Sequence, residues 1–148
     1  MKDRYLFRGK RIYNGEWVQG PYAVARDKFG IEQHNICIPD NNLGYFEWCA
    51  VNPSTICQCT GFKDDNGKLI WENDILFLKD EINEIEWKAI VKFGNPNGEY
   101  TYGWQLVPVG EFDVNKDILL WVETETEYMK CEVIGNKFDN PELLEVQE

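Results

Sequence analysis

Residues 61–76 read "GFKDDNGKLIWENDIL" and bring several carboxylates close to a glycine, as calcium-binding loops do. An EF-hand loop needs Asp at its first position, Gly at its sixth and Glu at its twelfth, because the last carboxylate closes the coordination sphere. With Gly67 in the sixth position, Phe62 and Asn73 occupy the first and last positions. The stretch therefore predicts no metal site. Instead, Asn66-Gly67 predicts a type I′ hairpin turn, in which both residues have positive φ.

A second chemical candidate is the pair of carboxylates on Glu72 and Asp74. Two residues apart at the start of a strand, they lie on the same side, and paired carboxylates can perform general acid and base catalysis. The alternative is structural, because Asp in a turn bonds its own backbone. His34 is the single histidine and is predicted to be an exposed loop residue. Cysteine–histidine chemistry between His34 and Cys37 remains an open alternative.

The cysteines do not have the spacing of a metal site. Zinc sites use four ligands in two close pairs, and only Cys57 and Cys59 form such a pair. In a strand these two thiols share one face, which indicates packing. The sequence also lacks the glycine-rich patterns GxxxxGK[ST] and GxGxxG that bind phosphates. We therefore predict no catalytic residue, no metal and no cofactor.

The N-terminal stretch "FRGKR" is basic, although the chain as a whole is acidic. We interpret it either as a strand with a solvated basic face or as a surface that contacts an acidic partner. That partner is an anion or nucleic acid contacted locally, an unknown protein, or the acidic half of a second copy. The six Trp residues exceed what small β units bury, so some are expected at a groove or interface. The predicted binding residues are Arg8, Lys10, Arg11, Trp17, Glu72 and Asp74.

The overall charge limits the class of partner. Lys and Arg total 15, Asp and Glu total 26, and the formal net charge is -11. Such a chain is repelled by phosphate backbones and anionic lipids, so direct nucleic-acid or membrane binding is disfavoured. The sequence contains no apolar run of signal-peptide or transmembrane length, and we expect a cytoplasmic protein.

The residues that surround these candidates have the patterns of antiparallel β structure. Asn-Gly occurs three times, beginning at Asn14, Asn66 and Asn97, and each occurrence predicts a hairpin. Residues 84–93 alternate between apolar and charged side chains, as a half-buried strand does, and residues 100–107 offer an aromatic partner strand.

Three further predictions complete the outline. Residues 117–123, "DILLWVE", are apolar on both faces and predict a central strand. The stretch "DNPELLE" predicts a short C-terminal helix capped by Asn140. Residues 20–50 predict short strands joined by exposed loops, with a boundary near Asn52-Pro53.

Three stretches, at residues 7–20, 51–76 and 131–145, resemble the YopX family, whose members are encoded mainly by bacteriophages and integrated prophages. The middle stretch matches through "TG", "D-NG" and "E-DI", and the last through "GN" and "NPEL". Two departures are Cys59, where the family has an aromatic residue, and Asn73, where it has Gly. Asn tolerates the left-handed conformation, so the turn at Asn73 can be kept.

The resemblance implies a mainly β fold. Residues 1–52 would form an antiparallel β portion and residues 53–148 an SH3-like small barrel with the C-terminal tail, or both would pack as one domain over 3–145. It implies no activity, because the family is functionally uncharacterised.

The function that we expect is a non-catalytic module, in a bacterial host cell, that binds a protein or associates with itself. One alternative is an acidic mimic of nucleic acid that occupies a DNA-binding protein of the host. The other is a small hydrolase or ligand-binding enzyme that uses Glu72, Asp74 or His34.

Overall fold

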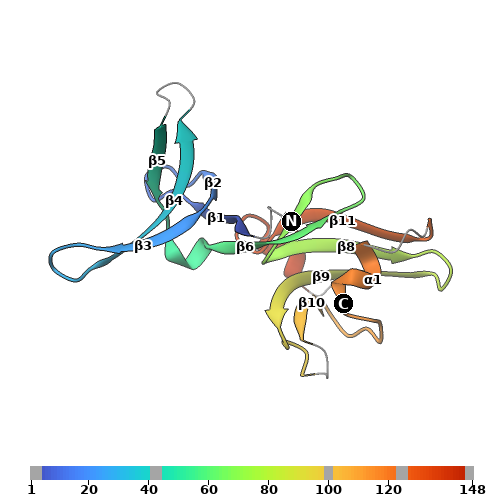
Figure 1. Cartoon of the computed structure of the whole chain (residues 1–148). Helices are drawn as coiled ribbons and strands as arrows, with labels where there is room; N and C mark the ends of the chain where they lie inside the picture. The colour runs from blue at the N-terminus through green and yellow to red at the C-terminus, as the bar shows by residue number, and fades with distance from the viewer. Residues whose placement is uncertain (1–4, 41–44, 99–101, 123–126, 146–148) are drawn as a thin grey trace. The chain divides into compact units, whose positions relative to one another are not determined.

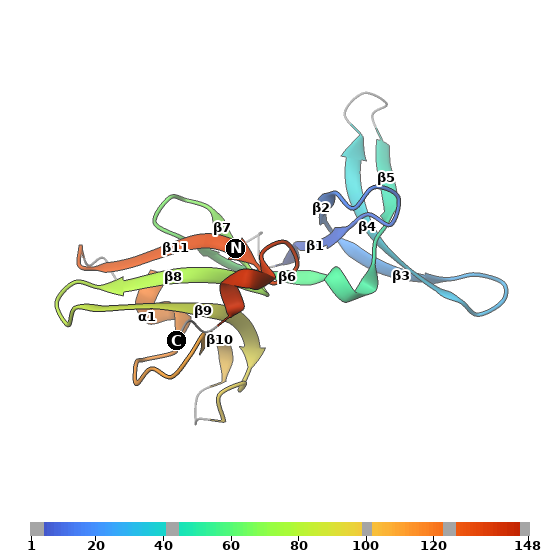
Figure 2. The same cartoon turned by 180° about the vertical axis from the view of Figure 1, so that it is seen from behind.

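The computed structural model describes residues 5–40, 45–98, 102–122 and 127–145. The chain forms two compact units, which we call unit 1 (Met1–Cys59) and unit 2 (Thr60–Glu148). The division between the units lies within the strand β6 (Cys57–Lys63), which starts in unit 1 and continues into unit 2. The boundary that we expected from the sequence, near Asn52, falls inside unit 1. Figures 1 and 2 show that strands make up most of both units.

Unit 1 consists of a hairpin and a three-stranded antiparallel sheet. In the hairpin, β1 pairs with β2, and β1 also pairs with the first residues of β6. The sheet has the order β3-β4-β5. The bounds are β1 (Phe7–Lys10), β2 (Trp17–Gly20), β3 (Tyr22–Arg26), β4 (Glu32–Asp40) and β5 (Tyr45–Ala50), followed by a 3₁₀ turn at Pro53–Thr55. The described residues of the range 20–50 thus form strands, as predicted, although β4 is longer than expected.

Close backbone contacts join the hairpin of unit 1 to its sheet. The amide of Cys37 donates to the carbonyl of Pro21 at 2.9 Å, and Arg11 forms an isolated antiparallel bridge with Val51. Gly20 permits this approach, since a Cβ there would lie 2.1 Å from the carbonyl oxygen of Cys37. Ile36 and Val51 are buried between these elements.

Unit 2 is built on a four-stranded antiparallel sheet with the order β10-β9-β8-β11. Its elements are β7 (Leu69–Trp71), β8 (Asp74–Asp80), β9 (Ile85–Gly94), β10 (Gly103–Pro108), α1 (Ile118–Val122), β11 (Met129–Asn136) and a 3₁₀ turn at Pro141–Leu144. The core gathers apolar side chains of β7 to β11 around Trp87, with Trp121 of α1 packed edge to face against it. The predicted strand at 84–93 is confirmed as β9, with Trp87, Ala89 and Val91 buried.

The mainly β fold is therefore confirmed, with antiparallel pairing throughout the described strands. Among those strands, β10 and β11 are the two ends of the unit 2 sheet and no pairing joins them. The SH3-like closure stays a prediction. Tyr100, in the predicted partner strand, lies outside the described residues.

The prediction of a central strand at 117–123 is wrong, since α1 covers Ile118–Val122. The side chain of Asp117 accepts a hydrogen bond from the amide of Leu119 at 3.0 Å, which favours the start of a helix. Ile118 and Trp121 are buried three residues apart, on one helical face. A short run that is apolar on all sides fits a buried helix as well as a strand, and packing decided between them.

The Asn-Gly turns form, but the type I′ assignment is wrong. Only the glycines take the left-handed conformation, with φ of 73° at Gly15, 78° at Gly67 and 69° at Gly98. Gly67 donates its amide to the carbonyl of Asp64, and Asp64 donates its own to Lys68. This is a type I turn followed by a glycine bulge, the pattern of three-residue hairpin loops.

The C-terminal helix is a 3₁₀ turn, Pro141–Leu144, and Asn140 does not cap it. Instead the side-chain oxygen of Asn140 accepts the amide of Asn136 at 3.2 Å. A Cβ on Gly135 would lie 2.5 Å from that same oxygen. Gly135 and Asn140 are therefore both needed for one tight loop.

Candidate functional site

The turn at Asp64 and Asp65 connects two distant segments of unit 2. One carboxylate oxygen of Asp64 accepts the amides of Asn66 and Lys68, and the other accepts the amide of Val133 at 2.9 Å. Asp65 accepts the amide of Cys131 at 2.8 Å. Within the described part of the chain, no three His, Cys, Asp or Glu side chains lie together in a way that could hold a metal. The two aspartates fasten β11 to the turn, and we call this arrangement the aspartate clamp.

Glu72 lies in the turn between β7 and β8, and Asp74 is the first residue of β8. Asp74 is 1% exposed, and its carboxylate accepts the amide of Trp71 at 2.9 Å. Asn73 between them has φ of 69°, so it takes the left-handed conformation, as expected from the sequence. Its side chain accepts a hydrogen bond from Lys92. These contacts support the structural alternative, in which Asp74 shapes the turn.

His34 lies on the strand β4 and its side chain is 21% exposed, so the prediction of an exposed loop residue is wrong. The hydroxyl of Tyr22 and Nδ1 of His34 form a short hydrogen bond, and their rings stack at 5.9 Å. Nε2 of His34 lies 3.7 Å from a carboxylate oxygen of Glu32. Burial raises the pKa of Tyr22, and the charge of Glu32 adds to this rise. Cys37 is three residues away and on the opposite face of β4, which separates it from His34.

All five cysteines are free thiols and buried. Cys57 and Cys59 lie on the same buried face of β6, as the alternation predicts, and the thiol of Cys57 donates to the carbonyl of Thr55. Burial raises the pKa of Cys49, whereas the positive charge of Arg11 opposes that rise. Burial raises the pKa of Cys131 to about 12.

Three of the predicted binding residues meet on the hairpin of unit 1. The guanidinium of Arg8 lies 4.7 Å from the centre of the Trp17 ring and the ammonium of Lys10 lies 5.3 Å from it. The register explains this contact, because Lys10 faces Trp17 and Arg8 lies two residues along the same face. Cation–π contacts of this kind hold the two positive charges close together.

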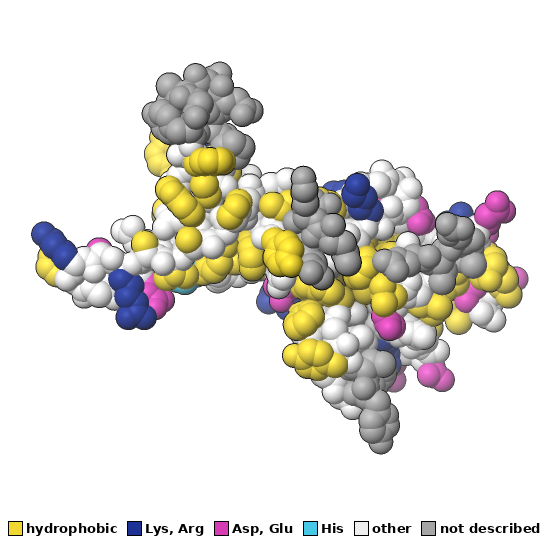
Figure 3. Space-filling model, in the orientation of Figure 1, with side chains coloured by type: hydrophobic (Ala, Val, Ile, Leu, Met, Phe, Trp, Pro, Cys, Tyr) yellow, Lys and Arg dark blue, Asp and Glu magenta, His cyan; other side chains and the backbone are white. Residues whose placement is uncertain are grey.

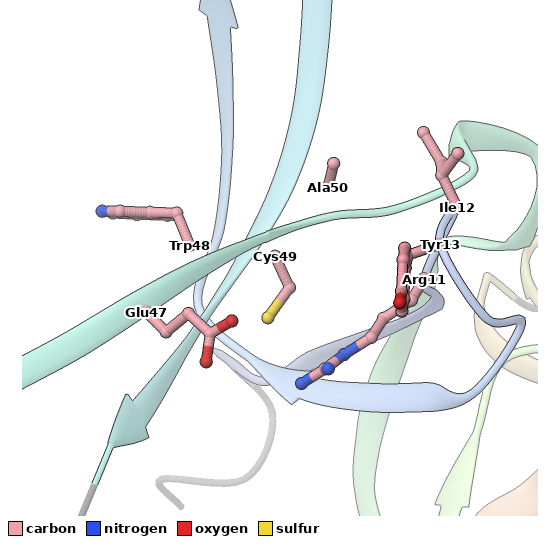
Figure 4. A pocket seen from close by; sticks show the side chains of 7 residues that line it. All are labelled: Arg11, Ile12, Tyr13, Glu47, Trp48, Cys49 and Ala50. Atoms are coloured by element: carbon pink, nitrogen blue, oxygen red, sulfur yellow. The ribbon is translucent and has the colours of Figure 1, made fainter.

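Arg11 belongs to a different site in unit 1, an open groove of about 530 Å³. The groove is lined by Arg11, Ile12, Tyr13, Glu47, Trp48, Cys49 and Ala50. Figure 4 shows the guanidinium of Arg11, the thiol of Cys49 and the carboxylate of Glu47 on one side of β5, with Trp48 pointing away from them. The groove thus places one positive side chain, Arg11, and one negative side chain, Glu47, next to apolar surface.

Apolar side chains around this groove are unusually exposed. Tyr13 is 93% exposed, Ile12 and Phe46 are each 68% exposed, and Trp48 is 56% exposed. Figure 3 shows hydrophobic side chains gathered over β4 and β5. We call Ile12, Tyr13, Phe46 and Trp48 the apolar patch. Contiguous exposed apolar patches are a common feature of interaction surfaces in proteins.

Charge is divided unevenly between the units. Residues 1–59 contain seven Lys and Arg and six Asp and Glu, a formal charge of +1. Residues 60–148 contain eight Lys and Arg and twenty Asp and Glu, a formal charge of -12. The acidity of the chain therefore comes from unit 2, and unit 1 combines near neutrality with the apolar patch.

The predicted residues are thus not one site. Arg8, Lys10 and Trp17 meet on the hairpin and Arg11 lines the groove in unit 1, whereas Glu72 and Asp74 belong to unit 2. Some Trp residues were expected at a groove, and Trp48 lines one, whereas the exposure of Ile12, Tyr13 and Phe46 was not predicted. The residues next to them in the sequence form no pattern that shows which apolar side chains the fold leaves exposed.

The fold defines a class of protein, a two-unit antiparallel β protein whose candidate sites are open surfaces. Residues 6–145 match the YopX protein family, so the chain belongs to the YopX family. A search among curated proteins found no match.

Two solved structures share the fold. The YopX protein of Bacillus subtilis is 17% identical, with a TM-score of 0.52 over 96% of this chain and 99% of its own. A protein of Enterococcus faecalis is 21% identical, with a TM-score of 0.51 over 94% of this chain and 96% of its own. At these identities the likeness concerns the fold alone. Among the described residues, no helix is long and apolar enough to span a membrane.

Proposed function

We propose that this YopX-family protein is a non-catalytic binding module that recognises another protein through the apolar patch of unit 1. The observation that carries the proposal is the exposure of Ile12, Tyr13 and Trp48, which line the groove, and of Phe46, which lies on the same face of β5 as Trp48. Exposed aromatic residues beside a hollow are typical of protein interfaces, where Trp, Tyr and Arg carry much of the binding free energy. The phage or prophage origin, which the resemblance implies, belongs to this proposal. The cytoplasmic location, which we expect because the sequence contains no long apolar run, belongs to it too.

The residues of the enzyme alternative give it little support. Asp74 is buried and bonded to the backbone of its own turn, and His34 belongs to the other unit. A general acid or base must reach the proton that it transfers. We therefore do not propose a hydrolase.

The test is affinity capture from a bacterial host extract treated with nuclease, followed by mass spectrometry. The test variant carries Tyr13→Ser and Trp48→Ser, and the control variant carries Ile82→Ser and Tyr102→Ser, which are exposed residues of unit 2. We expect the test variant to lose about tenfold or more of the captured partner, since hot-spot aromatics dominate binding. The control should retain it. Equal capture by both variants, or capture of nothing by the wild type, contradicts the proposal.

The division of charge favours a second candidate function, mimicry of nucleic acid by unit 2. A formal charge of -12 within 89 residues resembles the charge of a nucleic acid more than that of an average domain. If unit 2 is a mimic, the captured partner is a DNA-binding protein, and added duplex DNA competes for it. Substitutions in the apolar patch would then leave capture unchanged.

A further inference from the structure

We infer that the outer edge of β5 binds an extended peptide segment of a different protein, which adds to the sheet as a further β-strand. The inference rests on the proposed function of protein binding and adds the mode of binding and the chemistry of the partner. Strand addition of this kind takes its affinity from backbone hydrogen bonds and its specificity from alternate side chains.

The strand β5 forms one border of its sheet. The order is β3-β4-β5, and β5 runs along the margin of that sheet in both views (Figures 1 and 2). A border strand presents every second amide and carbonyl away from its neighbour, where they form a template for another strand.

The register identifies which residues face outward. The amide of Val51 donates to the carbonyl of His34 on β4, so odd-numbered residues at this end of β5 face inward. Because hydrogen-bonded and non-bonded pairs alternate in antiparallel pairing, the backbone groups of Phe46 and Trp48 face outward. Pro39 lies opposite Phe46 and has no amide to donate, which agrees with this assignment.

Part of this edge is already used within unit 1. The carbonyl of Ala50 accepts a hydrogen bond from the amide of Ile12 at 3.1 Å, and the amide of Asn52 donates to the carbonyl of Lys10 at 2.8 Å. The segment around Ile12 therefore pairs with the edge just beyond Trp48. Within the described part of the chain, no backbone partner is found on the outer side of Phe46 and Trp48. The docking edge thus has a defined end, and the groove lies at that end.

The side chains along β5 indicate which types of residue the added strand needs. Phe46 and Trp48 lie on one face and are exposed, whereas Glu47 lies on the other face, beside Cys49 and Arg11 (Figure 4). Opposite charges across neighbouring strands attract, and aromatic pairs stabilise the sheet. The partner segment therefore alternates apolar residues with charged ones. A basic residue lies opposite Glu47, and an acidic one lies toward Arg11.

A second copy of this chain fits the edge less well. Antiparallel pairing of two β5 strands centred on Glu47 would place this carboxylate directly opposite its own copy, and like charges there are destabilising. Pairing centred on Trp48 would bring Phe46 of one copy opposite Ala50 of the other, whose carbonyl is already bonded to Ile12. The charge pattern thus favours a partner of different sequence.

The first experiment measures amide hydrogen exchange of the full chain by NMR. In the free protein we expect the amides of Phe46 and Trp48 to exchange about a hundredfold or more faster than those of Glu47 and Cys49, because only the latter are bonded within the sheet. Equal protection of all four amides would mean that the edge is already paired, and the inference would fail.

The second experiment selects a random peptide library on the full chain. The expected peptides alternate apolar and charged residues, with a basic residue between two apolar ones. The amides of Phe46 and Trp48 become protected when such a peptide binds. Peptides without this alternation, or binding without this protection, contradict the inference.

Two variants then separate the backbone from the side chain. Phe46→Pro and Phe46→Ala both remove the ring, but only proline also removes the outward amide, and proline is tolerated at such edge positions. We expect Phe46→Pro to weaken peptide binding about tenfold more than Phe46→Ala does, with circular dichroism unchanged. Glu47→Lys should instead prefer peptides whose basic residue is replaced by Glu.

These outcomes distinguish the inference from the proposed function. If selected peptides lose binding with Trp48→Ser but are equally sensitive to proline and alanine at Phe46, the binding module stands and strand addition fails. If no peptide is selected and host capture also fails, both fail. Self-association that Phe46→Pro abolishes would make a second copy the occupant and overturn the choice of a different protein.

Discussion

Cys131 is a residue whose acidity depends strongly on the folded state. Its side chain is 1% exposed, and burial raises its pKa to about 12, with the charges of Asp65 and Asp64 adding to the rise. In the unfolded chain the pKa returns to about 9. Between these two values the unfolded state loses the thiol proton while the folded state retains it. Stability must therefore fall as pH rises through this range.

The prediction is a pH dependence that Cys131→Ala removes. From pH 9 to 12 the free energy of unfolding of the wild type should fall by up to about 1.4 kcal/mol per pH unit more than that of the variant. Tyr and Lys also titrate in this range, so the difference between the two proteins is the quantity to measure, by urea unfolding at each pH. Parallel curves for wild type and variant would show that the thiol pKa is not raised.

Single residues were predictable from the sequence where local backbone chemistry decides their role. Asn73 takes the left-handed turn position as expected, and the carboxylate of Asp74 bonds the backbone of its own turn. His34 was not predictable, because its environment comes from Tyr22 on another strand. A contact between strands depends on the register, which the residues around His34 do not specify.

At the scale of elements, the aspartate clamp holds β11 against the β6–β7 turn. Asp64 is buried and accepts three backbone amides, one of them from Val133. Removing the carboxylate breaks three part-buried hydrogen bonds at once, which costs more than the loss of a single exposed hydrogen bond.

We predict that Asp64→Ala lowers the free energy of unfolding by about 2–4 kcal/mol. Asp64→Asn keeps one acceptor oxygen, so its free energy of unfolding should lie between those of Asp64→Ala and the wild type. The control is Glu132→Ala, an exposed residue of β11, with an expected change within about 0.5 kcal/mol. Urea unfolding followed by Trp fluorescence measures the free energy of unfolding of all three variants. If Asp64→Ala loses no more stability than Glu132→Ala, the aspartate clamp does not stabilise the fold.

Elements with a clear period were predictable, and those without one were not. The strand at Ile85–Gly94 follows from its alternation, whereas α1 does not, since "ILLWV" is apolar on every side. The turns at Asn-Gly were located correctly, but their type depends on the twist of the flanking strands and not on the dipeptide alone. The border position of β5 is a property of the whole sheet, which no short window of sequence contains.

At the scale of the molecule, the two units differ strongly in formal charge. Unit 2 has a formal charge of -12 and unit 1 has +1, so electrostatic self-repulsion is confined to unit 2. Repulsion between exposed carboxylates opposes folding and is screened by salt.

The expected result is that added NaCl stabilises unit 2 more than unit 1. Raising the salt from about 0.01 M to 0.5 M shortens the screening length from about 30 Å to well under 10 Å. Hydrogen exchange with mass spectrometry should then show greater protection gained in residues 60–148 than in 1–59. A variant with Glu81→Gln and Glu84→Gln should respond less to salt. Equal gains in both units would mean that repulsion does not limit the stability of unit 2.

The candidate site was predictable only in part. The basic and aromatic character of the hairpin was evident, because Arg8, Lys10 and Trp17 are close in sequence and share one face. The groove was not, since it joins Arg11 to Glu47 across 35 intervening residues. Exposure of an apolar side chain is decided by what the rest of the fold leaves uncovered.

The aspartate clamp can form only late in the synthesis of the chain. Asp64 accepts the amide of Val133, which is synthesised 69 residues later, and Asp65 accepts the amide of Cys131, which is synthesised 66 residues later. The strand pairings of unit 1 all lie within its own 59 residues. At about 5–20 residues per second, the ribosome presents unit 1 several seconds before β11 emerges. A nascent chain therefore has every strand of unit 1 outside the ribosome, the border strand β5 among them, while unit 2 is still incomplete.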